Sequence, residues 1–276
     1  MAETTRTILI TGSTDGVGRR VAERLAAPDT TILIHGRDRQ RGESLVQAVI
    51  KSGGKAAFYC ADISSLSKIR ELADTILRDH SRLDVLINNA GIGVAGTYPG
   101  RCESPDGFEL RFAVNYLSGF LLTRLLLPIL DNGAPTRIVN VASVGQQAID
   151  FSDVMLTRGY SGQRAYCQSK LAQILFTFDL AEELKGTRVT VNALHPATYM
   201  ATAMVRRDGM SPISSVDEGA DAILNLAISP DLRDRSGLYF DGLRSSRAKA
   251  QAYDIDARQR LRALSFELTG LSHPVV

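Results

Sequence analysis

Cysteine is scarce in this chain, because only three residues of this type, Cys60, Cys102 and Cys167, occur among 276. Three cysteines cannot all pair, and none has a second cysteine at Cys-x-x-Cys spacing. The sequence therefore argues against a disulfide framework and indicates no zinc site. We expect no bound metal.

The chain also lacks an excess of either charge, since 32 basic and 30 acidic side chains leave a formal net charge of +2. No basic block is interleaved with aromatic residues, so we expect no nucleic-acid partner. No apolar run approaches the ~20 residues that span a bilayer. The polar start at residues 1–6 is too short for a signal peptide. We therefore expect a cytoplasmic protein without a membrane anchor.

No linker, repeat or low-complexity segment divides the chain, so its length suits one domain over residues 1–276. Apolar runs alternate with helical patterns throughout. This alternation predicts one parallel sheet of about seven strands with helices on both faces, a doubly wound α/β fold. The strand-like runs are 7–11, 31–35, 56–61, 84–87, 137–141, 189–194 and 237–240. The helical patterns are 19–26, 40–52, 66–80, 108–130, 165–184, 216–227 and 255–268.

The first strand-like run leads directly into a glycine-rich loop and then into a helix. This order is the one that a dinucleotide site requires. Glycines let the backbone turn sharply and approach a pyrophosphate, whose charge faces the amides at the helix N-terminus. A glycine loop by itself is a weak signal, and its place at the first strand-to-helix turn strengthens it. The predicted cofactor-binding loop consists of Gly12, Ser13, Thr14, Asp15, Gly16, Val17 and Gly18.

Arg37 follows the second strand, at the place where an acidic residue would bond the ribose hydroxyls of NAD. A guanidinium there can stack on adenine and bind a 2′-phosphate, so NADP is favoured over NAD. Asp15 and Asp38 count against this assignment. In the alternative interpretation, Arg37 is only a solvated residue at the start of a helix.

Two further strand ends carry candidate cofactor contacts. Asp62 and Ile63 follow the third strand, where a carboxylate can accept a hydrogen bond from the adenine amine. The fourth strand ends in the tetrapeptide 88–91, in which the amide of Asn89 can satisfy neighbouring backbone groups and the small Ala90 and Gly91 leave room for a ribose. Asn-Asn-Ala-Gly would also be unremarkable as a plain turn.

Tyr166 and Lys170 are four residues apart in a helical pattern and therefore project from the same face. A phenol has a pKa near ~10, and an adjacent positive charge lowers that pKa. We expect Lys170 to lower the pKa of Tyr166 so that the phenol exchanges a proton with a carbonyl or hydroxyl oxygen. Ser143 follows the fifth strand and can bond the same oxygen. Tyr-x-x-x-Lys also arises often by chance.

Asn115 lies in the middle of the apolar helical pattern 108–130. A buried amide needs a partner. It is either a satisfied core asparagine, or it bends the helix and holds a water beside Lys170 at the start of a proton wire.

Residues 144–165 form a long connection that we expect to shape substrate access. Residues 196–214 have no clear period and look like a mobile flap. Core or packing roles are favoured for His35 and His195.

These pieces together resemble the short-chain dehydrogenase/reductase family over nearly the whole chain. The matching motifs are Thr11-Gly12-x-x-x-Gly16-x-Gly18, Asn88-Asn89-Ala90-Gly91, Asn115, Ser143 and Tyr166-x-x-x-Lys170. The segments 165–172, 192–196 and 264–271 resemble the retinol-dehydrogenase-like branch, which includes WW-domain oxidoreductases, although no WW module is present. The resemblance implies a single Rossmann domain with a cofactor half at about 1–140, a catalytic and substrate half at about 141–243, and a tail helix at about 244–276.

The resemblance also implies roles for the site residues. Tyr166 would be the acid/base, Lys170 would lower its pKa and hold the nicotinamide ribose, Ser143 would orient the substrate oxygen, and Asn115 would support a proton relay. The segment that grips the carboxamide reads Pro196-Ala197-Thr198 instead of the family's Pro-Gly, with Thr202 one place late. We assign Pro196 and Thr198 to the cofactor. We expect no membrane anchor of the kind common in retinoid enzymes, and this expectation weakens retinoid as the substrate.

The resulting hypothesis is an NADP(H)-dependent oxidoreductase that interconverts a lipophilic ketone or aldehyde and its alcohol. The cofactor carries the hydride, and the protein supplies orientation and the proton. The competing hypothesis is a non-catalytic NADP(H)-binding redox sensor, and an epimerase or dehydratase is a weaker third. The expected oligomeric state is a monomer or a homodimer. The helices that bear Asn115 and Tyr166 could pair across a two-fold axis, unless the tail covers them.

Overall fold

The computed structural model describes residues 6–95, 98 and 100–272, and it is built on one sheet with the strand order β3-β2-β1-β4-β5-β6-β7-β8. Its first seven strands pair in parallel, as the sequence predicted, and β8 runs antiparallel to β7 at the edge. Beta8 was not predicted because its three residues are all exposed and carry no apolar pattern. The strands are β1 (Arg6–Ile10), β2 (Thr30–Gly36), β3 (Lys55–Cys60), β4 (Val85–Asn88), β5 (Thr136–Val141), β6 (Val189–His195), β7 (Leu238–Asp241) and β8 (Arg244–Ser246).

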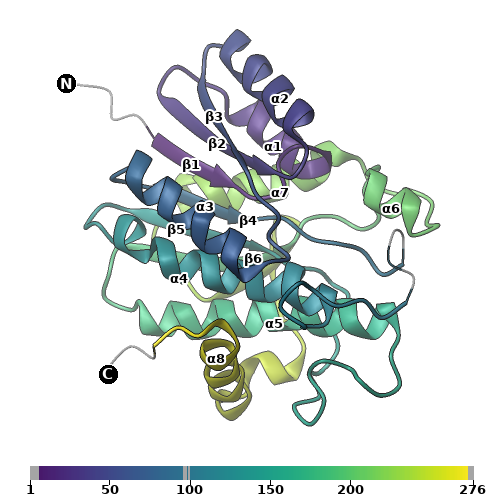
Figure 1. The fold of residues 1–276 in the computed structure, drawn as a ribbon. Helices are drawn as coiled ribbons and strands as arrows, with labels where there is room; N and C mark the ends of the chain where they lie inside the picture. Colours follow the sequence, from purple (N-terminus) through teal and green to yellow (C-terminus); the bar gives the residue numbers. More distant parts are fainter. Residues whose placement is uncertain (1–5, 96–97, 99, 273–276) are drawn as a thin grey trace.

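Helices cover both faces of the sheet (Figure 1). One face packs against α1 (Gly16–Leu25), α2 (Arg39–Lys51) and α7 (Val216–Ile228), and the other packs against α3 (Leu66–Asp79), α4 (Ser118–Leu130) and α5 (Gly162–Glu183). The apolar residues of β1 serve both faces, because Ile8 and Ile10 belong to the core beneath α1, α2 and α7, whereas Leu9 belongs to the core beneath α3, α4 and α5. Side chains alternate across a strand, so a strand buried on both faces reads as a continuous apolar run. The predicted doubly wound α/β fold is confirmed.

The predicted helix 108–130 is not one regular helix. Residues Phe112–Leu117 form a π-helix, and α4 follows it from Ser118. A π-helix carries an extra residue within a helical turn and is frequent at functional sites. The combined span Phe112–Leu130 is long and apolar enough to cross a membrane, in contrast to the expectation from sequence, and 67% of it is buried inside the protein. Such burial is also found in the core helix of a packed domain.

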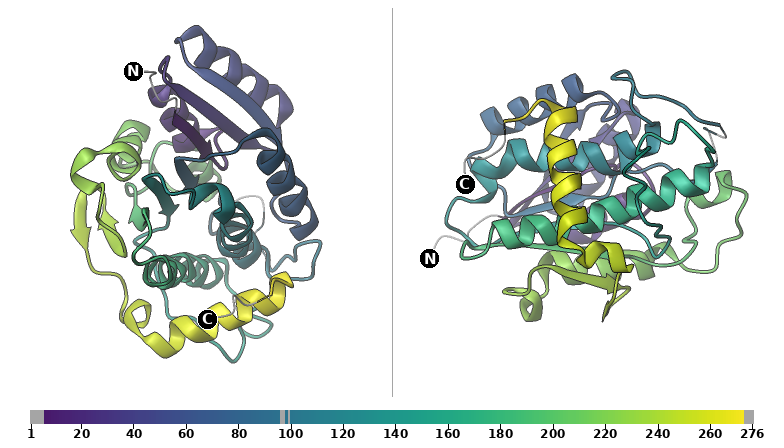
Figure 2. Two further views of the ribbon diagram at one scale, coloured as in Figure 1. Left: turned by 90° about the vertical axis from the view of Figure 1, so that its left-hand side faces the viewer. Right: turned by 90° about the horizontal axis from the view of Figure 1, so that it is seen from below.

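The tail helix α8 (Ile255–Thr269) crosses α5 on the outside of the molecule (Figure 2). Arg262 Nε donates to Asp179 Oδ2 at 2.6 Å, and the hydroxyls of Ser265 and Tyr116 lie 2.6 Å apart. Alpha8 therefore covers part of the helical face that a homodimer could have used.

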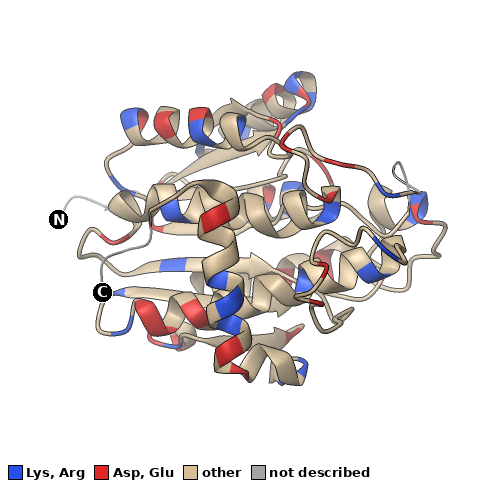
Figure 3. Ribbon diagram, turned by 60° about the horizontal axis from the view of Figure 1, so that its bottom comes forward, with Lys and Arg blue, Asp and Glu red and all other residues tan. Residues whose placement is uncertain are grey.

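The segment 196–214, predicted to lack regular structure, contains the short helix α6 (Ala203–Arg207). The remaining short elements are two 3-10 helices at Pro230–Leu232 and Ala250–Tyr253. In the view of Figure 3, basic and acidic residues are interspersed along the helices. Pairs such as Arg19 and Glu23, whose Nε and Oε1 atoms are 2.9 Å apart, account for this mixing.

Candidate active site

A cavity of about 670 Å³ lies at the carboxyl ends of the strands, where the loops after β1, β2, β3, β4, β5 and β6 meet. Ligands of open α/β sheets bind at this edge. The cavity brings together all the predicted site residues except Ser13 and Asn115. Those that line it are Gly12, Thr14, Asp15, Gly16, Val17, Gly18, Arg37, Asp62, Ile63, Asn89, Ala90, Gly91, Ser143, Tyr166, Lys170, Pro196 and Thr198.

The glycine loop packs directly on the turn after β4. Gly12 has a φ of +63°, and a Cβ there would lie 2.8 Å from the Cα of Ala90. A Cβ at Gly18 would overlap the side-chain amide of Asn89, which donates to the carbonyls of Thr11 at 2.9 Å and Gly12 at 3.1 Å. The two motifs found separately in the sequence thus form one structural unit.

The ring of His35 contacts the glycine loop and fixes its position. Its Nδ1 accepts from the Gly12 amide at 3.2 Å, and its Nε2 lies 3.2 Å from the Ala61 carbonyl. Burial lowers the pKa of His35 to about 4, so the ring is neutral at pH 7 and Nε2 donates its proton to Ala61. His35 is buried and packs under the loop, as favoured from the sequence, and it also lines the cavity.

Ser13 is a correction to the predicted cofactor set. Its hydroxyl donates to the Ile10 carbonyl at 2.8 Å, and its amide donates to the His35 carbonyl at 2.9 Å. The side chain is fully buried, so Ser13 stabilises the loop from inside and does not line the cavity. Sequence spacing placed it in the loop but could not give its direction.

Arg37, Asp15 and Asp62 line the charged end of the cavity, and Asp38 and Arg41 lie beside it. Arg37 is 59% exposed, with its Nη1 3.8 Å from Asp62 Oδ2. Arg41, which the sequence analysis did not single out, places its Nη1 3.1 Å from Asp15 Oδ2 and its Nε 3.3 Å from Asp38 Oδ2. The two acidic residues that counted against a phosphate are therefore both paired with Arg41. Asp38 is the N-cap of α2, because its side chain accepts from the Arg41 amide. Arg37 therefore lies before the start of this helix.

The candidate catalytic side chains come from β5 and α5. Ser143 follows β5, and Tyr166 lies in the first turns of α5, whose N-cap Ser161 accepts from the Arg164 amide at 3.1 Å. Ser143 and Tyr166 both line the cavity, and the Ser143 hydroxyl accepts from the Gly145 amide at 3.0 Å. Lys170 lies one turn further along, and its Nζ is 5.8 Å from the centre of the Tyr166 ring. The shared helix face predicted from the spacing is present.

The predicted lowering of the Tyr166 pKa by Lys170 is wrong for this structure. Burial raises the pKa of Tyr166 above its ordinary value, and the nearby Ser143 hydroxyl only partly opposes this rise. Burial also lowers the pKa of Lys170 to about 7. Its Nζ donates to the Val141 carbonyl and to Gln173 Oε1, both at 2.9 Å. The sequence spacing predicted that the two groups are neighbours, but it could not show that both are buried and that burial shifts their pKa values.

Asn115 is a satisfied core residue that joins three elements. Its Oδ1 accepts from the Ile92 amide at 2.8 Å, and its Nδ2 donates to the Ile92 carbonyl at 3.2 Å and to Ser169 Oγ at 3.0 Å. The π-helix therefore fastens the turn after β4 to the helix that bears Tyr166. The second alternative, a water held beside Lys170, stays a prediction.

The segment after β6 forms the opposite wall. Thr198 Oγ1 lies 3.0 Å from His195 Nε2, and Tyr199 has a left-handed φ of +45°. Thr202, one place later than in the family pattern, caps α6 and also lines the cavity beside Gly16. Other lining residues that sequence reasoning missed include Tyr98, Gln163 and Asp208. In the sequence, only their positions next to predicted motifs or inside the aperiodic segment 196–214 could have indicated that they line the site.

The donor set of the cavity fits a dinucleotide. Gly12, Gly16 and Gly18 line the cavity, which reaches the N-terminus of α1. Backbone amides at a helix N-terminus bind phosphate groups. Lys170 has three N–H donors, of which two are used within the protein, so one is left for a ribose hydroxyl.

Within residues 6–95, 98 and 100–272, no group of three or more His, Cys, Asp or Glu side chains could hold a metal ion. The cysteines are free.

The sequence profile of the short chain dehydrogenases matches residues 6–211. The chain belongs to the short-chain dehydrogenase family. Retinol dehydrogenase 13 of Homo sapiens is 38% identical, over 98% of this chain and 86% of the relative. Retinol dehydrogenase 14 of Mus musculus is 35% identical, over 96% of this chain and 86% of the relative. The resemblance to the retinol-dehydrogenase-like branch is confirmed.

Solved structures agree. An uncharacterized protein from Mycobacterium paratuberculosis is 30% identical with a TM-score of 0.79, covering 99% of this chain and 96% of its own. The landomycin C-6 ketoreductase with bound NADP and rabelomycin is 25% identical with a TM-score of 0.68, covering 87% of this chain and 97% of its own. This short-chain dehydrogenase is an NAD(P)-dependent oxidoreductase that acts on CH–OH or C=O groups.

Proposed function

We propose that this short-chain dehydrogenase uses NADP(H) in the cytoplasm to interconvert a lipophilic ketone or aldehyde and its alcohol, with Tyr166 as the proton donor and acceptor. One observation carries the proposal. Tyr166, Ser143 and Lys170 line the same cavity as the glycine loop, and Lys170 Nζ lies 5.8 Å from the centre of the Tyr166 ring.

The chain's own residues divide the chemistry between them. A bound nicotinamide nucleotide supplies or takes up the hydride. In reduction, Tyr166 Oη gives its proton to the substrate oxygen while the Ser143 hydroxyl donates a hydrogen bond to it. The raised pKa keeps the phenol protonated at neutral pH, which suits the donor role. Lys170 stands beside the ring to offset the negative charge that forms on Tyr166, and Asn115 holds the helix bearing both.

The preference for NADP rests on Arg37. Its exposed guanidinium lines the charged end of the cavity, while Arg41 pairs with Asp15 and Asp38 and so reduces their repulsion of a phosphate. Arg binds phosphate through a planar fork of donors. The landomycin ketoreductase, to which this chain is similar, contains bound NADP.

A lipophilic substrate is supported by the other end of the cavity. Apolar side chains line it from the turn after β4, from residues 110–114 and from the segment after β6: Val94, Leu110, Val114, Met204 and Met210. The related retinol dehydrogenases are named for an apolar alcohol. Pockets lined by such residues with a few convergent polar groups hold small apolar ligands.

The test is Tyr166→Phe, assayed for NADPH oxidation with a panel of ketones and aldehydes. Tyr59→Phe, which removes a hydroxyl on β3 bonded to Asp79 and His80, is the matched control. We expect Tyr166→Phe to lower kcat at least 100-fold, in line with the roughly 10²–10⁴-fold contribution of a general acid, and the control to keep wild-type activity. A Tyr166→Phe enzyme within threefold of wild type would refute the assignment. Tight NADPH binding by the wild type without turnover of any carbonyl would favour the redox sensor.

A further inference from the structure

Residues 197–214, which we call the flap, form one wall of the cavity but are held by little apolar contact. Side chains from Thr198 to Met210 line the cavity, yet none of the residues 201–215 is buried. Segments with few buried contacts open locally at low free energy. The position of the flap therefore depends on polar contacts at its tip.

Asp208 makes those contacts. Its Oδ2 accepts from the Val94 amide and its Oδ1 from the Ala95 amide, both at 2.9 Å. Among the described residues, these are the only hydrogen bonds that join residues 203–210 to a part of the chain outside the flap. Both carboxylate oxygens are used on two consecutive amides. Such charge-assisted pairs are stronger than neutral hydrogen bonds.

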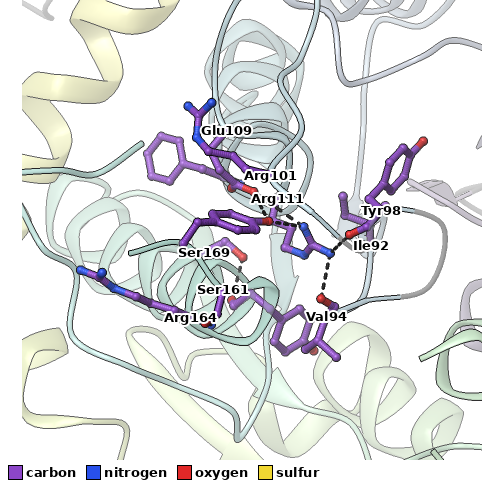
Figure 4. Close-up of polar contacts among 12 residues, drawn as sticks. Ile92, Val94, Tyr98, Arg101, Glu109, Arg111, Ser161, Arg164 and Ser169 are labelled. Atoms are coloured by element: carbon purple, nitrogen blue, oxygen red, sulfur yellow. Dashed lines mark hydrogen bonds and ion pairs between the residues drawn. The ribbon is translucent and has the colours of Figure 1, made fainter. Parts of the chain in front are cut away.

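The turn that receives Asp208 is built for this contact. A Cβ at Gly93 would overlap the Asp208 carboxylate, so only glycine allows this approach. The carbonyls of the same turn are fixed by the fully buried Arg111, which donates to Gly93 at 2.8 Å, Val94 at 2.9 Å and Tyr98 at 2.7 Å (Figure 4). With its carbonyls held by Arg111, the turn presents its amides to Asp208 in a fixed direction.

The side of the turn away from Asp208 is also closed. A Cβ at Gly162, the first residue of α5, would overlap the Val94 carbonyl. Arg111 Nη1 donates to the Tyr160 hydroxyl just before that helix. The turn is thus wedged against the start of the helix that bears Tyr166, and a closed flap is tied to the catalytic helix through it.

We propose that Asp208 is a positioning residue that latches the flap onto the turn 93–95 and closes the cavity over the substrate. The latch joins the cavity wall formed after β6 to the cavity wall formed after β4. A closed flap excludes water from the site of proton transfer. The closing of the cavity over substrate rests on the proposed function, whereas the latch itself does not.

The latch is tested without any activity measurement by limited trypsin digestion. Arg206 and Arg207 are exposed on the flap next to Asp208, so their cleavage reports flap opening. We expect Asp208→Asn to speed this cleavage at least fivefold, because an amide cannot accept from both N–H groups. Asp231→Asn, an exposed aspartate remote from the cavity, is the control and should match wild type. Gly93→Ala, which displaces the carboxylate from the other side, should repeat the effect. Cleavage of both latch variants within twofold of wild type would overturn the proposal.

Kinetics test the closing of the cavity. We expect Asp208→Asn to raise KM for the carbonyl substrate at least fivefold with kcat changed less than threefold. The charge of Asp208 contributes to the raised pKa of Tyr166, so the variant's pH profile for alcohol oxidation should also shift to lower pH. Fast cleavage with unchanged KM and pH profile would overturn the closing role. If the wild type turns over no substrate, the proposed function fails, and the trypsin comparison still decides the latch.

Discussion

Lys170 provides the sharpest test of the electrostatic account, because a buried ammonium should make folding depend on pH. Burial lowers its pKa from 10.5 to about 7. In the unfolded chain the group keeps its proton up to the higher value. Between these two pH values the unfolded state therefore binds more protons than the folded state, so stability rises with pH in this window. The perturbation is Lys170→Met, which keeps the length of the side chain and removes the charge.

The magnitude follows from the two pKa values. At 1.36 kcal/mol per pH unit, the difference between 10.5 and about 7 corresponds to about 5 kcal/mol in all. The buried ammonium of Lys170 destabilises the folded wild type by this full amount below pH 7, and by nothing above pH 10.5. Loss of the bonds to Val141 and Gln173 also affects the variant, but that cost does not depend on pH. The free energy of unfolding of wild type relative to Lys170→Met should therefore rise by roughly 1.4 kcal/mol per pH unit.

The assay is urea unfolding of both proteins at pH 7.5, 8.5 and 9.5, without cofactor. Other titrating groups are common to the two proteins and cancel in the difference. Lys51→Met, a change at an exposed lysine at the end of α2, is the control. We expect the difference to grow by about 2–3 kcal/mol across this range for Lys170 and to stay flat for Lys51. A flat difference for Lys170 would refute the reasoning that burial sets its pKa.

Two further predictions concern the cofactor. Arg37→Ala should raise KM for NADP at least tenfold and KM for NAD less than threefold, because only NADP carries the 2′-phosphate; equal changes, measured by initial rates, would remove the phosphate role from Arg37. Gly18→Ala should weaken NADPH binding at least tenfold in a fluorescence titration, because the new methyl overlaps Asn89 and displaces it from the Gly12 carbonyl; unchanged affinity would contradict the close packing of the two motifs.

The fold was predictable because buried parallel strands are continuous apolar runs, as residues 8–10 and 32–34 show. The helix pattern likewise placed α5 and α8 to within a few residues. Beta8 and α6 escaped prediction because neither buries a side chain. The π-helix at residues 112–117 escaped because its apolar sequence is equally compatible with an α-helix.

The sequence predicted those parts of the site in which a motif fixes the position of the backbone. It did not predict the direction in which individual side chains point. Gly12 and Gly18 could be assigned because close approach requires glycine. Ser13 in the same loop points into the core, and the partner of Asp208 lies on a distant turn. The pKa of Tyr166 depends on burial, which spacing along a helix does not report.

The central claim is that the phenol of Tyr166 faces the reactive carbon of a bound nicotinamide, and a crystal structure with NADPH and a ketone tests it most directly. The account predicts Tyr166 Oη within hydrogen-bond reach of the ketone oxygen, about 2.6–3.2 Å, with Lys170 Nζ on the nicotinamide ribose. A complex in which the hydroxyl of Tyr166 points away from the ketone, with Lys170 remote from the ribose, would contradict it.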